Sequence, residues 1–396
     1  MGRARLILPL FFMVMMIDGY DLAALPLSLP YIVKEMDIAP SAFSGALSAV
    51  LVGLGAGALL IGPLGDRFGR RVLIVGSLLL IAAATIGTAF SSTISEFVIW
   101  RFLTGAALGA CLPNVTAATA EVAAPQRRAA TIALISAGIS IGAITAGLIT
   151  PLLVRLGGWQ LIFHGAGVFI LLLAAVLFFV MPASEAATEK AESVAATRGS
   201  ILAPLSARYF PATALFVAFY TLNVFVLYMI VSWLPHLLTT AKLSLEASSQ
   251  LTAFFQGGGL VGGLLISWFI DRGRGVLAFM VAYGLAITAF VGTGGAGASA
   301  LIWAGLLAVI GAGASGAPLA IMALSSSFYP AHVYSAAIGL AVAVGRLGAI
   351  AGPLVGGRLV EQEYSPQSFL LICAAPLLAC MALAALSPRV KKADAA

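Results

Sequence analysis

The chain contains few charged residues, few cysteines and few histidines for its length. Of 396 residues, 9% are charged, three are cysteines and three are histidines. Cys111, Cys373 and Cys380 all lie in apolar stretches, and the last two are too far apart along one expected helix to form a disulfide. The histidines are widely separated, so they supply no metal-ligand cluster. We therefore expect packed thiols, no metal and no organic cofactor.

The chain is correspondingly rich in apolar residues. They make up 61% of the chain, and the mean hydropathy is +1.08, far above that of a soluble domain. The length leaves room for about a dozen spans of ~20 residues. The net charge of +6 is scattered through short loops and forms no stripe, so it does not indicate nucleic-acid binding. The composition predicts an all-α membrane protein.

Twelve apolar runs, bounded by charged or turn residues, predict twelve transmembrane helices. The first run is too long for a signal peptide and carries two aspartates, so we expect it to be retained as a span. One long polar segment separates six runs from the other six. We predict an N-terminal six-helix bundle at 1–182, a cytoplasmic linker at 183–209 and a C-terminal six-helix bundle at 210–396. The runs cover 6–29, 41–64, 72–90, 97–119, 129–152, 160–181, 211–238, 250–270, 276–294, 298–328, 335–358 and 367–386.

The lysines and arginines predict the orientation. Fifteen of the twenty-one fall in loops or termini on one side of the expected membrane and four on the other. Arg101 and Arg346 lie inside spans. Since cytoplasmic loops carry the excess of positive charge, both termini are expected in the cytoplasm.

Two aspartates, Asp18 and Asp21, lie inside the first span. A charge near the centre of a span costs about 2.5–3.5 kcal/mol on insertion scales, so such residues indicate a function. Their i,i+3 spacing places both on one helix face. At ~1.5 Å per residue, Asp18 lies about 18 Å and Asp21 about 22 Å along the span. The pair predicts a proton or ion pathway.

Two arginines match the two acids. Counted the same way, Arg101 lies about 6 Å below the outer edge, nearly level with Asp21, and Arg346 lies about 16 Å along its span. Pairing would lower the cost of burying four charges, and Arg346 could also bind a substrate carboxylate bidentately. Asp18, nearer the midplane, is the better candidate for the carried proton, and Asp21 for a structural or gating pair. The alternative is that these are fixed ion pairs that hold helices together.

Other polar and aromatic side chains in the spans could line a cavity. Aromatic walls suit an aromatic ligand, whereas the alternative for each residue is packing or interfacial anchoring. The candidates are Tyr20, Asn114, Tyr228 and Trp233, with Tyr220 and Asn223 as further positions.

Similar charged loops follow the second and the eighth span. They are Gly65-Asp66-Arg67-Phe68-Gly69-Arg70-Arg71 and Asp271-Arg272-Gly273-Arg274-Gly275. Matching loops in each half indicate a parallel repeat with the substrate site between the halves.

Several segments resemble one known family. Gly62-Pro-Leu-Gly65-Asp66-Arg67-Phe-Gly69-Arg70-Arg71 resembles the loop 2–3 signature of the major facilitator superfamily. Asp18-Gly-Tyr-Asp21 resembles the first span of its aromatic acid:proton symporters. The segments from Arg101 to Glu121, Tyr228 to Pro235 and Gly345 to Pro353 resemble their fourth, seventh and eleventh spans. The likeness covers nearly the whole chain and extends to hydroxyphenylpropionate and hydroxybenzoate transporters.

The resemblance implies a fold and an activity. The fold is the major facilitator fold, and the activity is uptake of a small aromatic acid anion with protons by alternating access. It further implies a functional monomer in a bacterial inner membrane, with the proton as coupling ion and no cofactor. Asp18 and Asp21 would couple the protons, and Arg101 and Arg346 would bind substrate or pair charges. The cytoplasmic gate would comprise Asp66, Arg67, Arg70, Arg71, Glu121, Asp271 and Arg272.

The chain departs from the family pattern at two positions. The family usually has Gly-Gln in the tenth span, where this chain has Gly316-Ala317. It also has an arginine four residues after the Tyr-Pro that ends the span, where this chain has Tyr334. These departures leave the substrate identity and one gate contact open.

Three other functions remain to be weighed. Gly348-x-x-x-Gly352-Pro353-x-x-Gly356 fits a pattern of drug:proton antiporters, but it falls in the eleventh span and not in the fifth. A membrane-embedded enzyme would need a nucleophile–base or metal constellation, and the sequence contains none that we recognise. A transporter-like sensor without transport is the third alternative.

Overall fold

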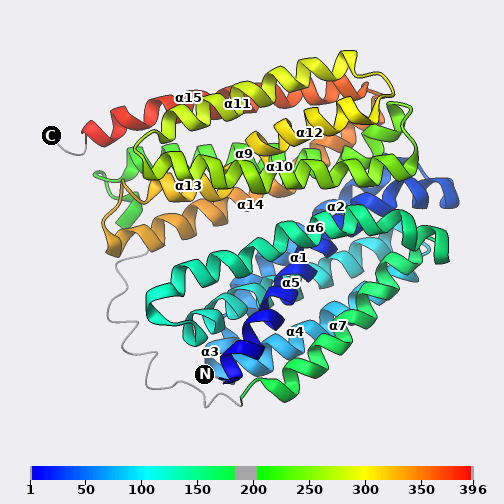
Figure 1. The fold of residues 1–396 in the computed structure, drawn as a ribbon, viewed down its shortest axis with the longest axis horizontal. Coiled ribbons are helices and arrows are strands. Elements are labelled where there is room, and N and C mark those ends of the chain that lie inside the picture. The colour runs from blue at the N-terminus through cyan, green and yellow to red at the C-terminus, as the bar shows by residue number, and fades with distance from the viewer. Residues whose placement is uncertain (1, 183–202, 394–396) are drawn as a thin grey trace. The chain divides into compact units, whose positions relative to one another are not determined.

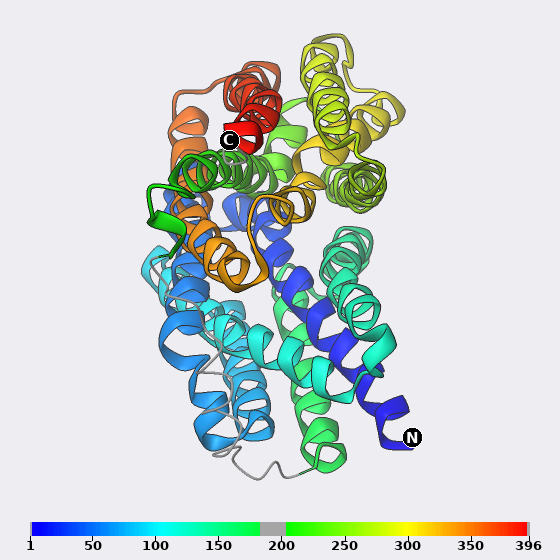
Figure 2. The same ribbon diagram turned by 90° about the vertical axis from the view of Figure 1, so that its left-hand side faces the viewer.

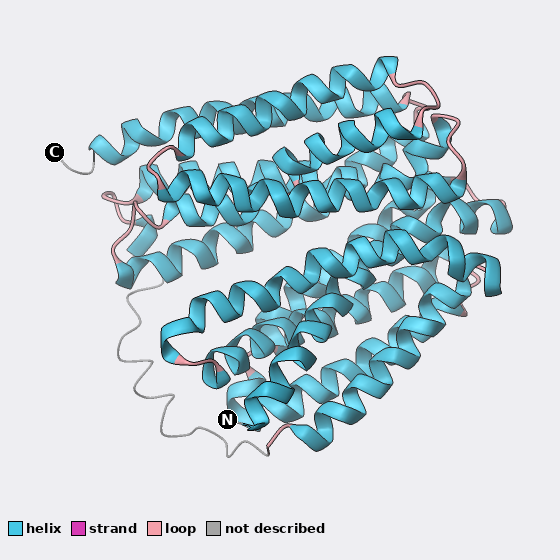
Figure 3. Ribbon diagram, viewed as in Figure 1, coloured by secondary structure: helices cyan, strands magenta, loops and turns pink. Residues whose placement is uncertain are grey.

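The computed structural model describes residues 2–182 and 203–393. Most of the expected linker, 183–202, lies outside the described residues. Every regular element in the described part is helical, as Figure 3 shows. Twelve of these segments are long and apolar enough to cross a membrane. The predicted all-α architecture of twelve spans is confirmed.

The chain divides into two compact units, Met1–Glu192 and Ser193–Ala396. Both are built from long helices joined by short loops (Figure 1). The first contains α1 (Gly2–Met36), η1 (Pro40–Phe43), α2 (Ser44–Ala56), the π-helical η2 (Gly57–Ile61), α3 (Leu64–Phe68), α4 (Arg70–Ala89), α5 (Ile94–Val122), η3 (Pro125–Arg127), α6 (Arg128–Gly157) and α7 (Gln160–Val180). The second contains η4 (Ala203–Leu205), α9 (Phe210–Thr240), α10 (Leu245–Asp271), α11 (Gly275–Gly292), η5 (Thr293–Gly295), α12 (Ala300–Ala314), α13 (Ala317–Ser325), α14 (Ala331–Glu361) and α15 (Pro366–Ala393).

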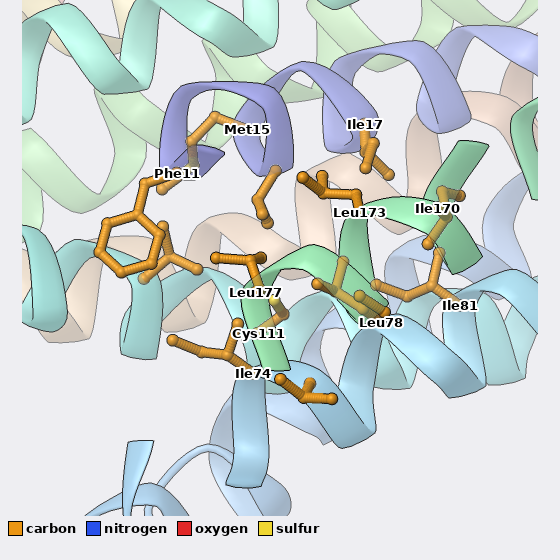
Figure 4. Close-up of a cluster of buried hydrophobic side chains, with 14 of the residues drawn as sticks. Phe11, Met15, Ile17, Ile74, Leu78, Ile81, Cys111, Ile170, Leu173 and Leu177 are labelled. Atoms are coloured by element: carbon orange, nitrogen blue, oxygen red, sulfur yellow. The ribbon is translucent and has the colours of Figure 1, made fainter. Parts of the chain in front are cut away.

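A cluster of buried apolar side chains forms the core of the first unit. Phe11, Met15 and Ile17 of α1 meet side chains of α4 and α7, as Figure 4 shows. The buried Cys111 of α5 lies in the same cluster and is a free thiol. Since lipid tails are as apolar as these side chains, close van der Waals packing stabilises such a core better than exclusion of water does.

Small residues bring α2 and its continuation η2 into backbone contact with α5. A Cβ atom added to Gly57 would lie 1.9 Å from the carbonyl oxygen of Ala106, and one added to Gly105 would lie 2.0 Å from that of Val50. Only glycine fits such positions, so these residues set the close crossing of the two helices.

The second unit packs α9 against α14, α10 against α12 and α11 against α15, and Figure 2 views these helices nearly end-on. Glycines of α14 lie on the backbone of α9. A Cβ atom at Gly348 would be 2.4 Å from the carbonyl oxygen of Thr221, and one at Gly352 would be 2.7 Å from that of Phe225. The glycine pattern that fits drug antiporters therefore serves helix packing here.

The structure corrects the predicted tenth span. We expected one helix over 298–328, but α12 ends at Ala314 and α13 begins at Ala317. Pro318 has no N–H to donate to the carbonyl of Ala314, and Gly316 immediately precedes the new helix. Proline and glycine together interrupt the span.

The first span is longer than predicted. It continues from residue 29 to Met36, through Pro30. We placed its end at the proline, but a transmembrane helix tolerates proline where neighbouring groups satisfy the freed backbone. The extension places Glu35 at the end of α1, where its carboxylate accepts hydrogen bonds from Trp159 (3.0 Å) and Gln160 (3.0 Å).

Candidate functional site

A buried ion pair joins α1 to α5. Nη1 of Arg101 lies 2.9 Å from Oδ2 of Asp21, and Nη2 donates to the backbone carbonyl of Asp21 at 3.0 Å. From α4, the hydroxyl of Thr85 donates to Oδ1 of Asp21 at 3.3 Å. Arg101 is 0% and Asp21 1% exposed. The pairing that we predicted from depth along the spans is confirmed.

The pair is costly to break. Charges removed from water are stabilised only while both partners are present, and loss of one partner typically destabilises a protein by about 3–5 kcal/mol. Because α1, α4 and α5 all contribute to the site, the ion pair also fixes these three helices against one another.

The four residues Asp18 to Asp21 face different neighbours. A Cβ atom at Gly19 would lie 1.7 Å from the carbonyl oxygen of Ile139, so this residue packs directly on α6. The hydroxyl of Tyr20 donates to the carbonyl of Ile162 at 3.0 Å and so reaches α7. Asp21 turns to Arg101, and Asp18, which is 3% exposed, lies near the thiol of Cys111 on α5. The two acids therefore occupy different environments.

The charged loop after the second span forms part of the predicted gate cluster. Nη1 of Arg70 lies 3.2 Å from Glu121 at the end of α5, and Nη2 lies 3.6 Å from Asp66. Gly69, at φ 89°, provides the left-handed backbone that the turn requires. The structure thus brings Asp66, Arg70 and Glu121 together.

In the part of the chain that the structure describes, the remaining arginines of this loop contact aromatic rings and not the acids of the gate cluster. The guanidinium of Arg71 lies 4.6 Å from the ring of Phe178 on α7 and donates to the Phe178 carbonyl. Arg67 lies over the ring of Phe68, its neighbour in the chain. In the second unit, Arg272 folds back over Trp268 at 3.5 Å, and Asp271 ends α10.

Asn114 holds the start of the same loop. Its amide nitrogen donates to the carbonyls of Gly62 and Ala110, each at 2.9 Å. A Cβ atom at Gly65 would lie 1.8 Å from its Oδ1. We expected this residue to line a ligand cavity, but its position supports the junction between η2 and the charged loop.

Trp233 also serves packing. It is 0% exposed, and its indole nitrogen donates to the carbonyl of Pro353 at 2.9 Å. A Cβ atom at Gly356 would lie 2.4 Å from the indole ring. The side chain therefore joins α9 to α14.

Arg346 lies in a different setting. It is only partly buried, and it is close enough to Tyr220 to interact with it electrostatically. Tyr228 also lies close to Tyr220. A Cβ atom at Gly345 would lie 2.5 Å from the Tyr220 ring, so α14 packs closely on Tyr220 at the residue next to Arg346 in the chain. An arginine close to a tyrosine suits a ligand with a carboxylate and an aromatic ring. The predicted pairing of Arg346 with Asp18 joins two separately described units and stays a prediction.

Sequence reasoning missed one polar contact. Oε1 of Gln256 on α10 accepts a hydrogen bond from the hydroxyl of Ser315 at 3.3 Å, at the interruption of the tenth span. Ala317, at the position where the family has its amide, is fully buried. Gln256 thus brings an amide to this break from another helix. Its signal was a glutamine in the interior of the apolar run 250–270.

Comparisons with known proteins agree with this geometry. A model of the Major Facilitator Superfamily matches residues 11–345. The 3-(3-hydroxy-phenyl)propionate transporter of Escherichia coli strain K12 is 31% identical over 360 residues, which cover 91% of this chain and 88% of that protein. The gallate transporter of Pseudomonas putida is 29% identical over 383 residues, covering 90% and 85%. The 4-hydroxybenzoate transporter PcaK of Acinetobacter baylyi is 29% identical over 388 residues, covering 89% and 84%.

Solved structures show the same fold. A bacterial homolog of the human lysosomal transporter Spinster superposes with a TM-score of 0.75 at 16% identity, covering 99% of this chain and 98% of that one. The D-xylose-proton symporter superposes with a TM-score of 0.72 at 18% identity, covering 95% and 96%. At this level of identity the likeness concerns the fold alone.

Proposed function

Because the chain belongs to the Major Facilitator Superfamily and closely resembles aromatic acid transporters, we propose that it imports a small aromatic carboxylate with protons by alternating access. The family and the curated relatives are transporters and not enzymes. The observation that carries the proposal is the pair of buried acids on α1, one of which is neutralised by Arg101. The proposed setting is a bacterial inner membrane, with both termini in the cytoplasm and a monomer as the functional unit.

Asp18 is the proposed carrier of the proton. Protonating Asp21 would leave the buried guanidinium of Arg101 without its counter-charge, which is the costly state of a buried pair. Asp21 therefore suits a structural or gating role. Asp18 lies one turn away, outside that ion pair, and is the acid that can change its charge without disrupting it.

Arg346 is the proposed partner of the substrate carboxylate. A guanidinium binds a carboxylate through two parallel hydrogen bonds, and the nearby Tyr220 offers aromatic surface to the ring. The relatives include transporters of gallate, 4-hydroxybenzoate and 3-(3-hydroxyphenyl)propionate, each a carboxylate on an aromatic framework.

The driving force follows from the number of protons. Each inward proton supplies about 1.4 kcal/mol per pH unit and about 2.3 kcal/mol per 100 mV of membrane potential. One proton with a monovalent anion is electroneutral, so only the pH gradient would drive uptake. Two protons would make transport electrogenic. Proteoliposomes with an imposed voltage and no pH gradient separate these two stoichiometries.

Replacing Asp18 tests the coupling. We expect Asp18→Asn to abolish accumulation of 4-hydroxybenzoate driven by a pH gradient, while exchange of labelled for unlabelled substrate continues, because exchange needs no net proton release. Glu96→Gln, which changes a carboxylate beside the backbone of Ser92 at the start of α5, is the matched control and should accumulate substrate normally. If Asp18→Asn still accumulates substrate against its gradient, the assignment of Asp18 is wrong.

Proton-coupled drug efflux is the competing function. It would give cells resistance to lipophilic cations and no acid-stimulated uptake of benzoate-like anions. The glycine pattern that first suggested it lies on the backbone of α9, where it brings α14 close. The relatives named above favour aromatic acid uptake.

A further inference from the structure

The first unit contains an apolar crevice of about 430 Å³ between α1, α6 and α7. In Figure 1, α6 and α7 diverge from the loop that joins them, and α1 packs against both. Residues of all three helices line the crevice. They include Met13 and Met16 of α1, Thr145 and Ile149 of α6, and Gly165 and Phe169 of α7.

The polar groups that reach the crevice already have partners. The hydroxyl of Tyr20 donates to the carbonyl of Ile162, and that of Thr145 donates to the carbonyl of Ile141 at 2.8 Å. Asp21 is paired with Arg101. The surface left for an occupant is therefore hydrocarbon.

The crevice offers no charged group for the proposed substrate to bind. Asp21 is the one ionisable carboxylate among the lining residues, and neither lysine nor arginine lines the crevice. An aromatic carboxylate bound here would find no cation to bind, because Arg101 is already paired with Asp21. An uncharged hydrocarbon chain needs no such partner.

The membrane around the protein supplies hydrocarbon chains of this kind. The lining helices α1, α6 and α7 are all long and apolar enough to cross the membrane. At the rim, Met13 is 39% and Phe169 48% exposed, so apolar side chains continue from the crevice to the surface of the unit. At this depth the surrounding medium of a spanning helix is lipid acyl chain.

We propose that this crevice binds an acyl chain of a membrane phospholipid. The acyl chain lies against Met16 and Ile17 of α1 and covers Tyr20 and Asp21 with hydrocarbon. Water is thereby excluded from the α6–α7 side of the Asp21–Arg101 pair. The proposal concerns the first unit alone and holds whether or not the protein carries aromatic acids.

Filling the crevice from either wall tests this binding. A Cβ atom added at Gly165 would meet no atom within 4 Å, so we use Gly165→Leu to extend a side chain into the crevice from α7. Thr145→Leu fills it from α6 and guards against a folding defect in the first variant. Gly76→Leu is the matched control, because Gly76 is exposed on α4, has equally open space and does not line the crevice.

The measurement uses the full-length protein, delipidated in detergent and titrated with dioleoylphosphatidylglycerol. Native mass spectrometry counts bound lipids, and thermal unfolding records the gain in Tm. We expect both filling variants to lose one tightly bound lipid and most of the lipid-dependent gain in Tm, whereas Gly76→Leu keeps both. Unchanged lipid retention in the two filling variants would overturn the proposal. So would a thermal shift from 4-hydroxybenzoate that the filling variants abolish, because the crevice would then bind substrate.

Discussion

The guanidinium of Arg101 combines three roles at the residue scale. It neutralises Asp21, it donates to the backbone carbonyl of the same residue, and it occupies a fully buried position on α5. Since Thr85 completes the shell from α4, a single carboxylate collects contacts from two further helices. The same contacts therefore hold the three helices together and keep the buried charges paired.

Replacing one member of this pair should cost far more than replacing both. We expect Arg101→Leu to lower the free energy of unfolding by about 3–5 kcal/mol, because Asp21 is left as a buried unpaired charge. The double variant Asp21→Leu/Arg101→Leu should recover most of that loss while transport stays absent. Thermal unfolding and proton-driven uptake of these two variants and of Asp21→Leu complete the cycle. If the double variant is as unstable as Arg101→Leu, the unpaired charge of Asp21 is not the cause of the lost stability.

Depth along the spans was enough to predict the partner of Asp21, because two charges at one level in a membrane have few alternatives. The roles of Asn114 and Trp233 were not predictable in this way. Each donates to a backbone carbonyl, of Gly62 and of Pro353 respectively, and a sequence does not show where carbonyls lie in space. The proposed transport roles of the site residues remain predictions.

At the element scale, the tenth span shows what apolar content can predict and what it cannot. The position of the helix was predicted, but its interruption was not. Apolar content predicted that a helix would lie over 298–328, and it does, in two parts. The interruption depends on Pro318 and Gly316, yet Pro26 and Pro30 are accommodated inside a continuous α1. At the break Gly316 precedes the proline by two residues, and Gln256 of α10 accepts a hydrogen bond from Ser315 there.

Restoring the missing donor should straighten this span. We expect Pro318→Ala to raise Tm, because the new N–H can bond to the carbonyl of Ala314. The more continuous helix should also slow uptake. Pro26→Ala, in the uninterrupted α1, is the matched control and should change uptake little. Tm and initial rates in proteoliposomes measure both effects. Faster uptake by Pro318→Ala would contradict a role for the break in transport.

At the scale of the whole molecule, the charge distribution predicts the orientation of the protein in the membrane. The loop at η3 belongs to the basic side, and the loop after α14 belongs to the other. The three native cysteines are buried free thiols, so they should contribute little background labelling. Single cysteines in these two loops can therefore report the orientation.

We expect Gln362→Cys to react with a membrane-impermeant maleimide in intact cells, and Gln126→Cys to react only after lysis. Both positions are exposed, so a difference between them reflects sidedness. Labelling of the unmodified protein under both conditions is the control. The reverse pattern would place the termini outside the cytoplasm and contradict the positive-inside assignment.

The crossing of α2 and α5 has a mechanical consequence. Carbonyl oxygens of each helix occupy the space that a side chain would take on glycines of the other, at Gly53, Gly57, Gly105 and Gly109. A shift of one residue would set a side chain against a carbonyl, so the two helices cannot change register. We therefore expect the two helices to move as one rigid body, with the Asp21–Arg101 pair near the start of α5 and the Arg70–Glu121 pair at its end. A tilt that starts at one pair would then be transmitted to the other.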